Sequence, residues 1–140
     1  MQVRLLYVSR AVGPQTTTVT GSILETARQH NQSNGITGVL CQGQGLFLQV
    51  LEGERSPVNR LYARILADPR HQDVELLHFE EISQRRFGNW SMAHVDLSST
   101  DPMIQLQHPE FDPYSATGAL MLAQLDDLLA SGQPIRTPLA

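Results

Sequence analysis

Two apolar stretches of strand length, separated by a short break that contains two glycines, constrain the fold of this chain most strongly. Residues 35–42 and 46–53 flank this break, and the pattern is typical of a β-hairpin with a glycine-dependent turn. Side chains alternate along a strand, so Phe47, Gln49 and Leu51 share one face, while the opposite face is apolar too. This pattern indicates a central strand covered on both sides. The amide of Gln49 therefore needs a polar partner, either protein backbone or a bound polar ligand.

Length and composition fit one globular domain. The 140 residues, 41% of them hydrophobic, are enough to bury a sizeable core but not to form a second full domain. The formal net charge of -4 argues against a general affinity for nucleic acid or for anionic membranes. The single cysteine, Cys41, is expected to be a small buried side chain in a reducing compartment, and no metal-ligand pattern is present. Without a signal-peptide pattern or a membrane-spanning stretch, the chain is expected to be soluble and cytoplasmic.

Patterning along the rest of the chain predicts a further set of strands and helices. The expected elements are a strand at 3–9, a helix that begins after the threonines at 16–18, the hairpin, a helix at 56–68, strands at 74–79 and 90–97, and a helix at 116–130. Ser56 is expected to cap the second helix, with Pro57 at its first position. The segment 80–89 is expected to be irregular, and 98–114 to be a linker.

This order of elements, β-α-β-β-α-β-β, predicts a ferredoxin-like α+β sandwich. Right-handed crossovers place both crossover helices on one face of a mixed five-stranded sheet. The stripe of Leu122, Leu125 and Leu129 makes the C-terminal helix amphipathic, so we expect it to cover the other face. The predicted organisation is a ligand-binding domain at 1–97, followed by a linker and a helix within 98–140.

Polar side chains from several segments are predicted to converge on a slot between the two crossover helices. These candidates are Tyr7, His30, Asn31, Gln49, Arg64 and Asp68, with Arg70 and His71 just beyond the second helix. Such a slot suits a flat heteroaromatic ring that has amide edges and an anionic tail. The alternatives are purely structural: a core tyrosine, a helix end rich in Asn and Gly, and a solvated cluster of charges.

Two residues near the end of the domain are candidates for a different reason. Trp90 and Met92 are two apart in a predicted strand and are therefore expected on one face, where plain core packing is the alternative. Nucleotide-binding glycine motifs, hydrolase triads and paired carboxylates give no signal. Arg10, after the first strand, matches the anion-binding arginine of acylphosphatases in one residue only, which is an analogy at the level of the fold.

Several separated motifs, in the same order, resemble the BLUF family of blue-light sensors that use FAD. The matching segments are 5–9 (LLYVS), 30–31 with 34–38 (HN and NGITG), 47–53 (FLQVLEG), 68–71 (DPRH), 85–87 (RRF) and 90–92 (WSM). The resemblance implies that the flavin ring lies between the two helices. It implies that Tyr7 donates an electron and a proton to the excited flavin, and that Gln49 relays the proton and rearranges its hydrogen bonds.

The same resemblance assigns roles to the remaining candidates. Asn31 holds the polar edge of the ring with His30 beside it, and the cluster formed by Arg64, Asp68, Arg70 and His71 lies near the ribityl and phosphate groups. Trp90 and Met92 pass the change to the strand edge and to the C-terminal segment. The implied cofactor is FAD, with FMN or riboflavin as alternatives.

The expectation from the sequence is therefore a photosensory flavoprotein rather than an enzyme. No cyclase or phosphodiesterase output domain is expected after Leu97, so the signal is expected to pass to a separate protein, through the C-terminal helix or a homo-oligomer. A light-independent module that binds a small ligand and an acylphosphatase-like enzyme are the alternatives. An absorption spectrum separates the first two classes, and hydrolysis of an acyl phosphate tests the third.

Overall fold

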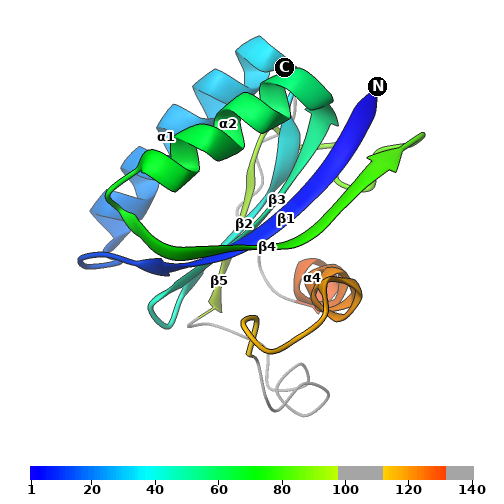
Figure 1. Cartoon of the computed structure of the whole chain (residues 1–140). Coiled ribbons are helices and arrows are strands. Elements are labelled where there is room, and N and C mark those ends of the chain that lie inside the picture. The colour runs from blue at the N-terminus through cyan, green and yellow to red at the C-terminus, as the bar shows by residue number, and fades with distance from the viewer. Residues whose placement is uncertain (98–111, 132–140) are drawn as a thin grey trace.

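The fold is a five-stranded sheet with two helices on one face and a third helix on the other (Figure 1). The computed structural model describes residues 1–97 and 112–131. The elements are β1 (Gln2–Ala11), α1 (Thr17–Asn34), β2 (Thr37–Gly43), β3 (Leu46–Glu54), α2 (Arg55–Ala67), β4 (His71–Ile82), β5 (Ala93–Asp96) and α4 (Gly118–Ser131). Within the described residues, no helix is both long enough and apolar enough to cross a membrane.

The strands are ordered β4-β1-β3-β2-β5, and this confirms the predicted ferredoxin-like arrangement with an added strand. β1 pairs antiparallel with both β3 and β4, and β2 pairs antiparallel with β3. β5 joins the far edge parallel to β2. Of the linker expected at 98–114, residues 98–111 lie outside the described part of the chain.

The central hairpin forms as predicted, with a tighter turn than the sequence suggested. β2 extends to Gly43, and the connection consists of Gln44 (φ 55°) and Gly45 (φ 76°). Two consecutive residues with positive φ define a type I′ turn, whose twist matches that of the flanking strands. The turn fixes the register that places Gln49 opposite Tyr7 of β1 on one side of β3 and opposite Leu40 of β2 on the other.

The two faces of the sheet carry two apolar layers. The layer against α1 and α2 contains Val3, Leu5, Tyr7, Phe47 and Leu51, and this set confirms the predicted alternation along β1 and β3. The layer against α4 contains strand residues from β1, β2, β3 and β5 together with Met121, Leu122, Leu125, Leu128 and Leu129. The C-terminal helix therefore covers the second face, as its leucine stripe predicted (Figure 1).

The sequence signals predict the ends of α1 correctly but not the start of α2. α1 begins after Thr16, whose Oγ1 accepts the N–H of Val19 at 3.2 Å, and it ends at Gly35 in the left-handed conformation (φ 65°). The prediction that Ser56 caps α2 was wrong. α2 begins at Arg55 after Glu54, which makes no side-chain capping bond, and the Ser56 hydroxyl instead accepts from Arg60 at 2.6 Å.

The predicted bounds of the last two strands were also wrong. β4 runs to Ile82 rather than to residue 79, because it pairs with β1 along nearly the whole length of that strand. β5 begins only at Ala93, so Trp90 and Met92 precede it. They do not share a face: Met92 packs in the layer under α1 and α2, whereas Trp90 packs against the layer under α4. The strict alternation expected of a strand does not apply, because the 90–92 segment is not one.

A buried carboxylate anchors the loop between β4 and β5. Glu52 of β3 is fully buried, and it accepts hydrogen bonds from Arg4 Nε at 2.8 Å and from the backbone N–H of Arg86 and Phe87, at 3.0 and 2.5 Å at closest. Phe87 is buried in the layer under α4. This anchor fixes the path of the chain just before the 90–92 segment.

Candidate functional site

A hydrogen-bonded pair from two neighbouring strands forms the floor of the candidate site. Tyr7 and Gln49 lie directly opposite each other in the β1–β3 ladder, and the Tyr7 hydroxyl donates to Gln49 Oε1. Gln49 Nε2 points to the sulfur of Met92 at 3.5 Å. All three side chains are buried. Burial raises the pKa of the Tyr7 phenol far above its ordinary value, so the group is a neutral O–H donor at physiological pH.

Helix α1 contributes Asn31, a fully buried amide in the wall of the cavity. Asn31 Nδ2 donates to the carbonyl of Ser91 at 2.9 Å, while Oδ1 is buried and has no hydrogen-bond partner among the described residues. A buried amide oxygen without a partner is unusual and costly in a folded protein. The orphaned oxygen therefore points to a bound group that donates a hydrogen bond.

His30, next to Asn31, lies at one end of the cavity against Arg64 of α2. The distance between His30 Nδ1 and Arg64 Nη1 is 3.1 Å. Burial, the charge of Arg64 and that of Arg60 lower the pKa of His30, in that order of importance. The imidazole is therefore neutral at pH 7, and Nδ1 accepts from the guanidinium.

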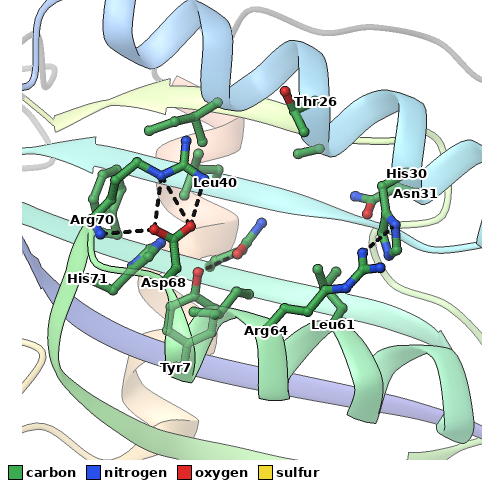
Figure 2. A pocket seen from close by; sticks show the side chains of 15 residues that line it. Tyr7, Thr26, His30, Asn31, Leu40, Leu61, Arg64, Asp68, Arg70 and His71 are labelled. Atoms are coloured by element: carbon green, nitrogen blue, oxygen red, sulfur yellow. Dashed lines mark hydrogen bonds and ion pairs between the residues drawn. The ribbon is translucent and has the colours of Figure 1, made fainter.

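The opposite end of the cavity is formed where α2 passes into β4 (Figure 2). Arg70 binds Asp68 through Nε at 3.0 Å and Nη2 at 2.6 Å, and these bonds lower the pKa of the Asp68 carboxyl. His71 Nδ1 lies 2.7 Å from Ser9 Oγ, and the ring packs 4.8 Å from that of Phe47. Burial lowers the pKa of His71.

These groups enclose a cavity of about 180 Å³ between α1, α2 and the sheet. The structure brings together all eight residues predicted for the slot, which are Tyr7, His30, Asn31, Gln49, Arg64, Asp68, Arg70 and His71. The sequence did not single out the rest of the lining, which is Ile23, Thr26, Ala27, Leu40, Phe47, Leu61 and Ile65. Most of these side chains are apolar and cover the broad walls, so the polar groups are few and placed at defined points.

Trp90 and Met92 do not line the cavity. Met92 contacts the cavity lining at Gln49. Arg10 lies elsewhere: it forms an ion pair with Asp73 at 3.4 Å and its guanidinium stacks over the ring of Tyr114. Within the described residues, no cluster of His, Cys, Asp and Glu is arranged to hold a metal ion.

Three successive carbonyls hold the segment before β5 in place. The carbonyl of Trp90 accepts from Gly38 N at 3.2 Å, and that of Ser91 accepts from Asn31. The carbonyl of Met92 accepts from Arg28 Nε at 3.3 Å. Sequence patterning gave no signal for Arg28, because only the three-dimensional packing of α1 against this segment reveals its role.

The family and the solved structures agree with this geometry. The family model BLUF, "Sensors of blue-light using FAD", matches residues 2–93. The chain belongs to the BLUF family, whose domains bind flavin and sense blue light. It is similar to the ground state of BlsA (31% identity, TM-score 0.84, covering 99% of this chain and 93% of that chain). It is also similar to the dark state of BlrB (31% identity, TM-score 0.78, covering 94% and 97%).

Larger proteins contain the same domain. The chain is 36% identical over 104 residues to photoactivated adenylate cyclase subunit beta of Euglena gracilis, a match that covers 72% of this chain. It resembles a bacterial light-regulated adenylyl cyclase with 34% identity and a TM-score of 0.74, covering 93% of this chain and 36% of that chain. The match spans 12% of the Euglena protein's length, so the cyclase activity in its name belongs to that larger protein.

Proposed function

We propose that this chain is a blue-light photoreceptor that holds FAD in the cavity between α1 and α2 and responds through Tyr7 and Gln49. The observation that carries the proposal is the buried chain of contacts from the Tyr7 hydroxyl to Gln49 Oε1 and from Gln49 Nε2 to Met92. It begins at the cavity wall and ends in the segment before β5.

The residues around the cavity fit a flavin. A flavin ring is flat and presents an N–H donor and carbonyl acceptors along one edge, with an anionic tail at the other end when it carries phosphate. Asn31 Oδ1, buried without a partner within residues 1–97 and 112–131, is available to accept that N–H, and Arg64 offers donors nearby. Apolar side chains from α1, α2 and the sheet match the faces of the ring. Arg70 and Asp68 form an ion pair at the other end of the cavity, where the tail of the flavin would lie.

Tyr7 and Gln49 supply the switch. A bound flavin contributes the absorption of blue light and, once excited, a strong one-electron oxidant. Tyr7 is a neutral phenol, so its oxidation releases a proton as well as an electron. That proton has an acceptor in place, because the Tyr7 O–H already points at Gln49 Oε1. Gln49 would take it up at Oε1 and pass one from Nε2 to the flavin that accepted the electron, or rotate its amide, and either change would exchange the donor and acceptor that face Met92.

The signal then leaves through the 90–92 segment. Met92 contacts Gln49, whereas Trp90 packs against the layer under α4, so a shift of the segment reaches both faces of the sheet. We infer that residues 1–97 form the flavin-binding unit and that the α4 side carries the response to a separate signalling protein or to a second copy of the chain. The relatives that are named as cyclases couple the same domain to an enzyme within one protein, and this supports an output outside residues 1–97.

The test is the absorption spectrum of the purified protein loaded with FAD, in the dark and under blue light. The wild type is expected to shift reversibly to longer wavelength. Tyr7→Phe and Gln49→Leu are expected to bind flavin but to lose the shift, while Tyr114→Phe keeps it, because Tyr114, which donates to Asp73 O, does not line the cavity. A wild type that binds flavin without any shift would favour the light-independent module, and a protein that cannot be loaded would refute flavin binding.

A further inference from the structure

Arg28 of α1 holds the segment before β5 with only part of its donor set. Its Nε donates to the Met92 carbonyl at 3.3 Å, a long bond for a guanidinium donor. Its Nη2 is buried and has no hydrogen-bond partner among the described residues. A buried guanidinium nitrogen without an acceptor is costly, so this arrangement is poised to change if an acceptor comes within reach.

His94 of β5 presents an unpartnered nitrogen on the same side of the sheet. His94 is 8% exposed, and its Nε2 is buried without a partner in the described part of the chain. It pairs with Leu40 of β2, which lines the cavity, so the imidazole faces α1. Burial lowers the pKa of His94, Asp96 opposes that shift and the charge of Arg28 adds to it. The ring is therefore neutral, and one of its nitrogens can accept a hydrogen bond.

The Met92 carbonyl and His94 are close in the chain. His94 follows Met92 by two residues, at most roughly 6.6 Å of chain, and its partner Leu40 lies in the same apolar layer as Met92, on the α1 side of the sheet. If the Arg28 guanidinium releases the Met92 carbonyl, the next acceptor along β5 is therefore the His94 imidazole. One arrangement satisfies the carbonyl of Met92, and the other satisfies both the Arg28 guanidinium and His94.

We propose that Arg28 is a positioning residue with two alternative acceptors, the Met92 carbonyl in the state described here and His94 Nε2 in the light-adapted state. The proposal rests on the proposed function, because the rearrangement of Gln49 against Met92 is what drives the exchange. Arg28 then makes a second switchable hydrogen bond, in addition to the one that Gln49 makes. It releases the 90–92 segment from α1 at the moment when Gln49 changes its contact with Met92.

The experiment follows the carbonyl of Met92 by NMR. Met92-Ala93 is the one Met-Ala pair in the sequence, so ¹³C-carbonyl methionine combined with ¹⁵N-alanine gives a single resonance for that peptide group. Its ¹³C shift reports the hydrogen bond on the Met92 carbonyl. The spectrum is recorded on flavin-free protein, and on flavin-loaded protein in the dark and under blue light, with the absorption shift recorded from the same sample.

Three variants and one control separate the outcomes. Arg28→Gln is expected to move the resonance upfield in the dark, with or without flavin, and to abolish its response to light. His94→Leu is expected to leave the dark resonance in place and to suppress the response to light. It is also expected to speed dark recovery about tenfold, because the light-adapted state loses one charge-assisted hydrogen bond. His94→Gln retains an acceptor and is expected to recover within about twofold of the wild type. Arg55→Gln, on the exposed start of α2, is the matched control.

Two results would overturn the proposal. One is a dark resonance that is the same in Arg28→Gln and in the wild type, which needs no photochemistry to observe. The other is a response to light in His94→Leu equal to that of the wild type. If the wild type shows no absorption shift at all, the proposed function itself fails, and the dark measurement on Arg28→Gln still decides whether Arg28 holds the carbonyl.

Discussion

Replacing Glu52 by Gln is expected to destabilise the fold strongly, although the substitution changes neither size nor shape. Glu52 is fully buried, binds the guanidinium of Arg4 and accepts the backbone N–H groups of Arg86 and Phe87. An amide offers one acceptor oxygen in place of two, and its NH₂ group faces donors. Oε1 accepts both backbone N–H groups and Oε2 accepts from Arg4, so the single oxygen of the amide keeps only one of these two sets, while Glu80 still pairs with Arg4.

The expected magnitude follows from these contacts. Breaking a buried ion pair by removing one partner costs about 3–5 kcal/mol, and each backbone hydrogen bond to a charged acceptor is worth about 1.5–3 kcal/mol. For a chain of this length, a loss of about 3–5 kcal/mol lowers the melting temperature by roughly 10–20 °C. Thermal unfolding followed by circular dichroism measures the change, and hydrogen exchange at the amides of Arg86 and Phe87 is expected to accelerate.

Glu54→Gln is the matched control for this prediction. Glu54 is on the same strand, but its ion pair with the N-terminus is solvent-exposed, so its replacement is expected to leave the melting temperature almost unchanged. A Glu52→Gln protein that melts within about 3 °C of the Glu54→Gln protein would refute the view that the buried carboxylate anchors the loop.

Three further substitutions test the packing and the pH dependence. Gly38→Ala would place a Cβ 2.0 Å from the carbonyl oxygen of Val50, so the variant is expected to fail to fold or to lose several kcal/mol in urea unfolding, whereas Gly45→Ala is strained only by its positive φ. Leu125→Ala, in the layer that joins α4 to the sheet, is expected to lower the free energy of unfolding by about 2–5 kcal/mol; a smaller loss than in the exposed Leu120→Ala would contradict the packing. Burial holds the folded-state pKa of His71 below its ordinary value of 6.5, so its contribution to stability is present above pH 6.5 and is lost as the pH falls from there through the lower folded-state pKa. Urea unfolding at pH 7.5 and 5.5 is expected to show a larger loss in the wild type than in His71→Gln, and equal losses would contradict the shift.

Local patterning predicted the centre of the fold because the same side chains set both pattern and packing. The alternation of Phe47, Gln49 and Leu51 identified a strand buried on both faces, and that strand lies in the middle of the sheet. The leucine stripe of the last helix predicted which of its sides faces the sheet. In each case the periodicity of hydrophobic residues is itself the cause of burial, so it can be read without the structure.

Local patterning failed where contacts between distant segments decide the conformation. The 90–92 segment has the alternation of a strand, yet backbone and side-chain donors from β2 and α1 hold its carbonyls and place Trp90 and Met92 on opposite sides of the sheet. Ser56 and Pro57 form a standard helix-start signal, but the Ser56 hydroxyl accepts from Arg60 and the helix begins two residues earlier, at Arg55 instead of Pro57. Propensity is overridden in both cases by partners that lie elsewhere in the sequence.

The position of the candidate site was predictable from the order of the elements, whereas the chemistry of its ligand was not. The convergence of Tyr7, Asn31 and Gln49 on one slot followed from the order of the elements, and the cavity confirms it. The chemistry of the ligand came from the resemblance to a family and not from spacing. The orphaned oxygen of Asn31 and the unpartnered groups of Arg28 and His94 depend on side-chain packing, and only the structure reveals them.

We propose that the contact between Tyr7 and Gln49 is the light-driven switch. The most direct measurement is the light-minus-dark absorption difference of the FAD-loaded protein, compared between the wild type and Gln49→Leu at equal flavin occupancy. We expect a reversible shift to longer wavelength in the wild type and none in Gln49→Leu. A shift of the same size and recovery rate in both proteins would contradict it.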